Sequence, residues 1–339
     1  MCCCPRPLSR AGRALGVAAA VLVTFASPAA ADPAGPSDFR AEVSEIAPAV
    51  DGVRAEIRGG DAFLELSVAE GVEVVVEGYS GEPYLRFLAD GTVERNAASP
   101  ATYLNEDRKG AAEVPAGASV DAAPDWEQVA TGGTYAWHDH RVHWMGDASP
   151  SVERGEQVPG AYDPWRVPMS VDGEDVEVRG TLTYEEATSP LPWVALALVV
   201  AGALVWAGRR MPVRAGAAAL VVASILAVVV GRADFAATPD GSGNALLWVL
   251  PVVALVVAAL ALALAARSVG VIAGLAAVAT LSGWALLRLE VWMRPVLPTD
   301  LPFVVDRAAV AVALGAAVGA GYLAVTSGLL ALPDLADDE

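Results

Sequence analysis

Residues 191–207 read LPWVALALVVAGALVWA, an uncharged run of apolar and small residues. Four further apolar runs follow it, at residues 215–230, 245–266, 269–287 and 303–330. A helix needs about 17–25 such residues to cross a bilayer, because each residue advances it by about 1.5 Å. The second run falls slightly short of that length and needs Pro212 and Val213 to reach it. The sequence therefore predicts five transmembrane helices within residues 189–332, in a multi-pass protein of the cell membrane whose partner is the lipid bilayer.

The first 31 residues are typical of a signal peptide. Three arginines, Arg6, Arg10 and Arg13, precede an apolar stretch at residues 15–25, and residues 29–31 form an A-x-A cleavage site. The apolar stretch is too short to span a bilayer. We expect cleavage before Asp32, with an uncleaved anchor as the alternative. The only three cysteines lie in this segment, so we expect a mature chain with no disulfide and no thiolate metal site.

The segment between the signal peptide and the first apolar run, residues 32–188, is strongly acidic. It contains 31 acidic and 11 basic residues, in a chain whose net charge is −18. Such a surface repels nucleic-acid phosphates, so nucleic acid is excluded as a partner. Arginines at positions 209, 210 and 214 follow the first apolar run, and positive loops face the cytoplasm. We therefore expect residues 32–188 outside the membrane and the acidic tail, residues 333–339, in the cytoplasm.

Residues 32–188 have strand periodicity rather than helix periodicity. Apolar and polar residues alternate, imperfectly, at residues 39–46, 53–57, 63–68 and 72–76. Asp90-Gly91 and Asp172-Gly173 each lie between two such runs, and Asp-Gly favours the positive φ of tight hairpin turns. No amphipathic helix is evident, and residues 97–124 are loop-like. The predicted fold is an antiparallel β-sandwich-like ectodomain followed by a five-helix transmembrane bundle.

All three histidines lie within residues 135–145, which read YAWHDHRVHWM. On an extended strand, His138 and His140 would share one face, roughly 6–7 Å apart. His143 and Met145 would lie on the other face and would join the pair only through a bulge or turn. Imidazole nitrogen suits copper and zinc, and a thioether favours Cu(I). We therefore expect a copper or zinc site with His138 and His140 at its core and His143 and Met145 as further ligands.

The alternative for this segment is structural. Trp137 and Trp144 would pack in the core, an Asp139–Arg141 pair would balance its own charge, and the histidines would be satisfied by hydrogen bonds. No ligand is then needed.

Signals for catalysis are weak. Residues 78–81 read GYSG, which is not the G-x-S-x-G elbow of a serine nucleophile, and the strand–turn–helix setting is missing. The sequence contains no phosphate-binding loop, no dinucleotide-binding fingerprint and no HExxH motif. We therefore expect a protein that is not an enzyme.

Three segments carry a resemblance to other proteins: GYSGEPY at residues 78–84, SPATYLN at 99–105 and WHDHRVHW at 137–144. Together they resemble a group of uncharacterised bacterial exported membrane proteins, with the histidine-rich segment as the most specific part. The architecture is loosely similar to envelope copper-handling proteins that join a β-sandwich to transmembrane helices. This chain departs from the copper-binding sandwich family, because its predicted mature terminus is Asp32 rather than a histidine ligand.

The resemblance implies a topology more firmly than an activity. We expect a membrane-tethered extracytoplasmic binding or accessory protein that handles copper or another transition metal, with an envelope protein as a further partner. One alternative is a structural or interaction protein of the envelope without a ligand. Another is a transporter with an auxiliary ectodomain, which a polar path through the helices would favour.

Overall fold

The computed structural model describes residues 34–106, 108–110, 112–239, 243–265 and 267–326. The signal peptide and its cleavage site, and the acidic tail at residues 333–339, lie outside the described residues. These therefore remain predictions. The described residues belong to one compact unit, within which a β domain is followed by long apolar helices.

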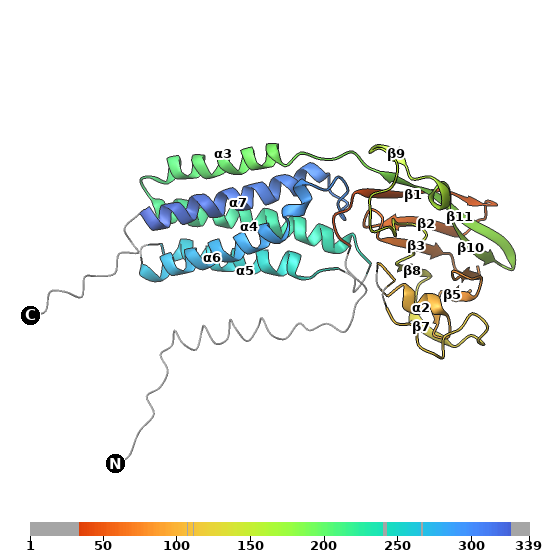
Figure 1. The fold of residues 1–339 in the computed structure, drawn as a ribbon. Coiled ribbons are helices and arrows are strands. Elements are labelled where there is room, and N and C mark those ends of the chain that lie inside the picture. The colour runs from red at the N-terminus through yellow and green to blue at the C-terminus, as the bar shows by residue number, and fades with distance from the viewer. Residues whose placement is uncertain (1–33, 107, 111, 240–242, 266, 327–339) are drawn as a thin grey trace, which may run out of the picture. The chain divides into compact units, whose positions relative to one another are not determined.

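The β domain consists of two antiparallel sheets (Figure 1). The larger has eight strands in the order β1-β11-β10-β4-β5-β6-β7, with β9 added onto β11; the smaller has the order β2-β3-β8. The strands of the larger sheet are β1 (Phe39–Ala47), β4 (Val74–Glu77), β5 (Pro83–Phe87), β6 (Val93–Asn96), β7 (Trp126–Ala130), β9 (Glu156–Gln157), β10 (Trp165–Val171) and β11 (Glu174–Tyr184). Those of the smaller sheet are β2 (Val53–Arg58), β3 (Phe63–Val68) and β8 (Thr134–Trp137). The predicted antiparallel β fold is confirmed.

The two Asp-Gly turns join neighbouring strands as expected, but in different ways. Asp172 and Gly173 both have positive φ, 49° and 84°, and connect β10 directly to β11. At the turn between β5 and β6 only Gly91 has positive φ, while the Asp90 carboxylate accepts a hydrogen bond from the Thr92 amide. This second turn is longer than the first, because β5 ends at Phe87 and β6 starts only at Val93. The Asp90-Gly91 pair therefore supplies its positive φ through Gly91 alone.

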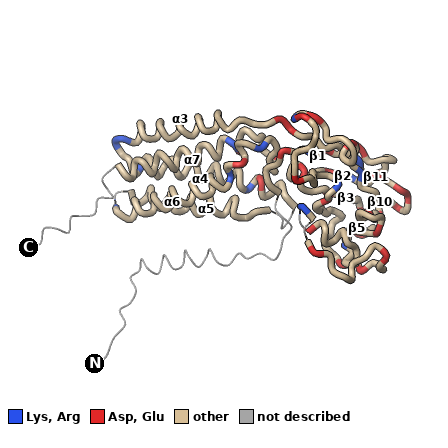
Figure 2. The backbone as a smooth tube through the Cα atoms, viewed as in Figure 1, with Lys and Arg blue, Asp and Glu red and all other residues tan. Residues whose placement is uncertain are grey.

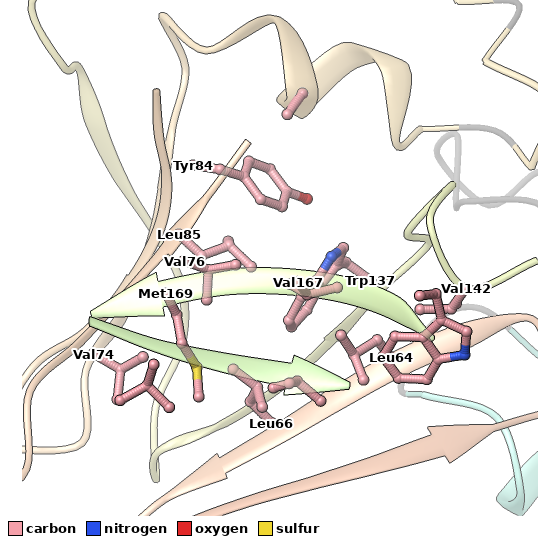
Figure 3. Packing of buried hydrophobic residues seen from close by; sticks show 14 of the residues in the cluster. Leu64, Leu66, Val74, Val76, Tyr84, Leu85, Trp137, Val142, Val167 and Met169 are labelled. Atoms are coloured by element: carbon pink, nitrogen blue, oxygen red, sulfur yellow. The ribbon is translucent and has the colours of Figure 1, made fainter. Parts of the chain in front are cut away.

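A single hydrophobic core contains side chains from both sheets (Figure 3). Leu64 and Leu66 of β3 are fully buried, as are Val76 of β4 and Val167 of β10. In β3, β4, β10 and β11 alternate side chains point into this core, which is why the sequence has a period-two pattern there. Burying each such side chain contributes about 1.5–3 kcal/mol.

The loop-like stretch at residues 97–124 contains one short helix, α2 (Pro100–Leu104). Ser99 caps it by accepting a hydrogen bond from the Ala101 amide, and Pro100 occupies the first turn, where its missing N–H costs nothing. A short 3₁₀ helix, η1 (Gly160–Tyr162), precedes β10. These are the helical segments of the described β domain, and both are short.

Five helices follow the β domain, and each is long and apolar enough to cross a membrane (Figure 1). They are α3 (Leu191–Gly208), α4 (Pro212–Ala236), α5 (Leu246–Ala263), α6 (Ser268–Leu287) and α7 (Phe303–Thr326), with the 3₁₀ helix η2 (Leu289–Trp292) after α6. The five helices make the chain a multi-pass membrane protein. Many large apolar side chains on them face outward, as lipid contact requires.

The second apolar run, residues 215–230, forms only the middle of a longer helix, since α4 has 25 residues. Pro212 starts the helix at a position that needs no amide hydrogen, and the far end continues through Arg232 and Asp234. The expected contribution of Pro212 and Val213 is confirmed. In α7, Gly315 and Gly319 lie four residues apart and both pack against α3, where a larger side chain would collide with it.

Charge is distributed as the composition indicated. Figure 2 shows acidic residues throughout the β domain and few charged residues along the helices. Three of the charged residues in this region, Asp234, Arg288 and Asp306, are buried.

Candidate functional site

The three segments quoted for the resemblance meet in one polar cluster beside the β-domain core. The Ser99 hydroxyl donates to Glu82 across a buried contact of 2.9 Å, which joins the second segment to the first. The Tyr79 hydroxyl and the Asn105 side chain form another hydrogen bond between these segments. The third segment joins through His140, whose amide donates to the Tyr79 hydroxyl at 3.0 Å. Segments that are far apart in sequence therefore build one site.

The strand predicted across residues 135–145 is wrong beyond Trp137, where β8 ends. The Asp139 side chain accepts a hydrogen bond from the Arg141 amide at 3.0 Å, and the Asp139 carbonyl accepts one from the Val142 amide at 3.0 Å. These local bonds form a turn in place of a strand ladder, as Asp side chains often do. His138 and His140 therefore do not lie side by side on a strand face.

Asp139 and Arg141 form an ion pair between a buried carboxylate and a half-buried guanidinium, as the structural alternative predicted. The Asp139 carboxylate has no exposed surface; it accepts from Arg141 at 2.7 Å and from the Trp137 indole at 2.8 Å. Burial alone would raise the pKa of Asp139, but the Arg141 charge and these hydrogen bonds together lower the pKa below its usual value. The pair holds the histidine turn in place.

His138 is an anchored core residue. It is 1% exposed, and its ring stacks on Phe63 with the ring centroids 4.1 Å apart. Its Nδ1–H donates to the carbonyl oxygen of Ala62 at 2.7 Å. These contacts fix the ring against β3.

His143 is fully buried and uses one nitrogen only. Its Nε2 lies 2.6 Å from the carbonyl oxygen of Arg108, and because a carbonyl can only accept, Nε2 carries the hydrogen. Nδ1 is then an acceptor with a lone pair, and it has no hydrogen-bond partner. Burial, with the nearby Arg108 charge second, lowers the pKa of His143 to about 3. His143 is therefore a neutral imidazole with one unused nitrogen.

His140 lies against His143. Their ring centroids are 5.5 Å apart in an edge-to-face arrangement, and the other side of His140 stacks on Tyr79 at 5.6 Å. The His140 amide donates to the Tyr79 hydroxyl at 3.0 Å. His140 is half-buried, so this pair can be reached from solvent. Gly110 lies so close to the His140 ring that a side chain there would collide with it.

Met145 lies just beyond the turn. Its amide donates to the Tyr162 hydroxyl at 3.3 Å, and the neighbouring Trp144 ring packs on Tyr162 with the centroids 5.7 Å apart. Of the four predicted ligands, the structure brings His140 and His143 into contact, and it places His138 in the core against Phe63.

Tyr79 and Arg108 also belong to the site, although the sequence did not predict them as site residues. Tyr79 supports His140, and burial is the main reason why the pKa of Tyr79 is raised. Arg108 accepts the His143 hydrogen bond through its carbonyl and pairs through its guanidinium with the fully buried Asp61 at 2.5 Å. The sequence contained a partial signal, because Tyr79 belongs to a resemblance segment. No local sequence pattern marks Arg108 as a site residue, because its role depends on a contact with a residue 35 positions away.

The described part of the chain contains no group of three or more His, Cys, Asp or Glu side chains arranged to hold a metal ion. What it does contain is the adjacent pair His140 and His143. Comparison with protein-family models, with curated proteins and with solved structures finds no match in any of the three. The site is therefore interpreted from its own geometry.

Proposed function

We propose that this protein is a membrane-anchored extracytoplasmic binding protein that holds a Cu(I) ion between His140 and His143. The observation that carries the proposal is the Nδ1 of His143: a buried acceptor without a partner, on a ring in contact with a second imidazole. The extracytoplasmic location rests on the arginine bias of the loops. The role is binding or accessory rather than catalytic, and an envelope protein that delivers or receives the ion is its expected partner.

The hydrogen bonding of His143 supports a metal-ligand role. Histidine ligands commonly donate their second N–H to a carbonyl, which orients the ring and leaves the other lone pair for the metal. His143 has this arrangement through Arg108. Leaving a buried acceptor unpaired costs about 1–3 kcal/mol, which metal coordination would remove. Because the pKa of His143 is about 3, protons do not compete for this nitrogen near neutral pH.

The number of ligands favours copper over zinc. Protein zinc sites are almost always tetrahedral and need at least three protein ligands, whereas the site offers two adjacent imidazoles. Cu(I) has a filled d shell and accepts two nitrogen ligands in a linear arrangement. Imidazole is a suitable ligand for copper, and a thioether would add to it. Met145 is the nearest such group along the chain, just beyond His143.

Metal titration of the full-length protein in detergent tests the proposal. Cu(I) is added in competition with a colorimetric chelator, and the wild type should take up one equivalent. His143→Gln keeps an N–H in reach of the Arg108 carbonyl but lacks the Nδ1 lone pair, so uptake should be lost. His138→Asn is the matched control: it keeps a donor for Ala62, and uptake should persist. Zn²⁺ is titrated in parallel.

Two results would overturn the proposal. Uptake that is unchanged in His143→Gln would place the ion elsewhere. A wild type that takes up no copper, with both variants destabilised, would favour the ligand-free structural protein. The Asp139–Arg141 ion pair is the observation that favours this second function, because it stabilises the turn without any ligand.

A further inference from the structure

Three charged side chains meet inside the helical bundle, apart from the histidine site. Asp234 lies in the last turn of α4, Arg288 follows the end of α6, and Asp306 lies in the first turn of α7. Their exposed fractions are 2%, 5% and 0%, so none is solvated by water around the protein. Charged groups in such positions are expensive and need a partner.

Arg288 contacts the two carboxylates in different ways. Arg288 Nη2 lies 2.5 Å from Oδ2 of Asp234 and 2.5 Å from Oδ2 of Asp306, so these two oxygens are at most 5.0 Å apart. Only the contact with Asp306 has the direction of a hydrogen bond. Neither buried carboxylate oxygen of Asp234 accepts a hydrogen bond of good geometry, nor does Oδ1 of Asp306. One guanidinium therefore faces two carboxylates.

Other cations of the bundle do not balance the second carboxylate. Arg307 directs its guanidinium to the carbonyl oxygens of Val291, Arg294 and Pro295. Arg232 is exposed, and its guanidinium lies over the rings of Phe235 and Trp248.

The remaining charged groups near this end do not change the balance. Arg294 pairs with Asp38 at 2.5 Å, and Arg40 of β1 lies over the Phe303 ring. Glu290 and Asp300 of the segment between α6 and α7 are exposed acids and add no positive charge. Among the described residues, Arg288 is the one cation in an ion pair with Asp234 or Asp306. The cluster has one negative charge too many for a dry interior.

The helix dipoles decide which carboxylate remains charged. Asp306 lies at the N-terminal end of α7, where the unpaired amides favour a negative charge, and it accepts the hydrogen bond from Arg288. Asp234 lies at the C-terminal end of α4, where the unpaired carbonyls disfavour one.

We propose that Asp234 is a proton-binding site: at neutral pH it holds one proton, beside an ionised Arg288–Asp306 pair. Two carboxylates this close share a proton because both cannot be charged next to a single guanidinium. The bound proton makes the Asp234–Arg288–Asp306 cluster neutral overall. The ligand is a proton rather than a metal ion, because the Arg288 guanidinium between the two carboxylates would repel a metal cation.

Infrared spectroscopy of the full-length protein in lipid nanodiscs at pH 7 tests this. A protonated carboxyl group gives a C=O stretching band separate from the amide bands, and the band shifts in D₂O. Asp234→Asn should remove this band while leaving the melting temperature close to that of the wild type, because Asn resembles a protonated Asp. Asp300→Asn, an exposed acid at the same end of the bundle, is the control and should keep the band.

The stability of a second variant provides an independent readout. Asp306→Asn should lower the melting temperature well below that of Asp234→Asn, because it leaves Arg288 without its ionised partner. Absence of the band in the wild type, a band of full intensity in Asp234→Asn, or equal losses of stability in the two variants would each overturn the proposal. A band that appears only when Na⁺ is removed would assign the site to a monovalent cation instead, and would also overturn it.

Discussion

Replacing His143 should change how the stability of the β domain depends on pH. The unfolded chain binds a proton on His143 as the pH falls through about 6.5, whereas the folded protein, with a pKa of about 3, does not. The stabilisation from keeping this imidazole neutral is therefore fully present above pH 6.5 and declines as the pH falls towards 3. Between pH 7.5 and pH 5 this difference in pKa lowers the free energy of unfolding by about 2 kcal/mol.

The assay is pulse proteolysis in urea, performed on the full-length protein in detergent with a metal chelator present. A brief protease pulse cleaves unfolded β domain, so the surviving band reports the folded fraction. Between pH 7.5 and pH 5, the free energy of unfolding should fall by about 2 kcal/mol more in the wild type than in His143→Gln. The comparison cancels other titrating groups, including the remaining two histidines. Equal pH dependence in the two proteins would mean that His143 is solvated or already protonated, and would refute the reasoning.

Three further predictions concern the ion pair, the bundle and the topology. Asp139→Asn should destabilise the β domain by about 3–5 kcal/mol in the same assay, because it leaves Arg141 without a charged partner; a loss below about 1 kcal/mol would contradict a buried pair. Gly231→Ala should lower the melting temperature in detergent, because its methyl group would meet the Leu247 carbonyl of α5. Gly202→Ala is the control and should be tolerated, since Gly202 has open space around it. Equal effects of the two substitutions would count against the α4–α5 packing. A cysteine at Asp172 should react with an impermeant thiol reagent on intact cells and one at Arg210 only after permeabilisation, and the reverse pattern would invert the predicted orientation.

The helices could be predicted from sequence because the signal is local. A bilayer demands continuous apolar length, and residues 191–207 satisfy it without any tertiary contact. The strands were visible for a similar reason, since one face of each sheet packs on a shared core. The end of α4 was harder to predict, because Asp234 lies beside Arg288, a residue distant in sequence that follows the end of α6.

The site was only partly predictable. Clustering of the three histidines is evident from the sequence, but their geometry follows from an Asp139 side chain that replaces the strand with a turn. The contact between His140 and His143 depends on that turn, and the unused nitrogen of His143 depends on the carbonyl of Arg108. Such contacts between distant segments have no signature in a single sequence, which is why the sequence alone favours His138 over His143 as a core ligand.

X-ray absorption spectroscopy of the copper-loaded full-length protein tests the central claim most directly. The proposal predicts Cu(I) with two nitrogen ligands and the outer-shell scattering of two imidazole rings. In His140→Gln one imidazole contribution should disappear, while His138→Asn should retain both. A spectrum without imidazole scattering, or one that is unchanged in His140→Gln, would contradict a copper site between His140 and His143.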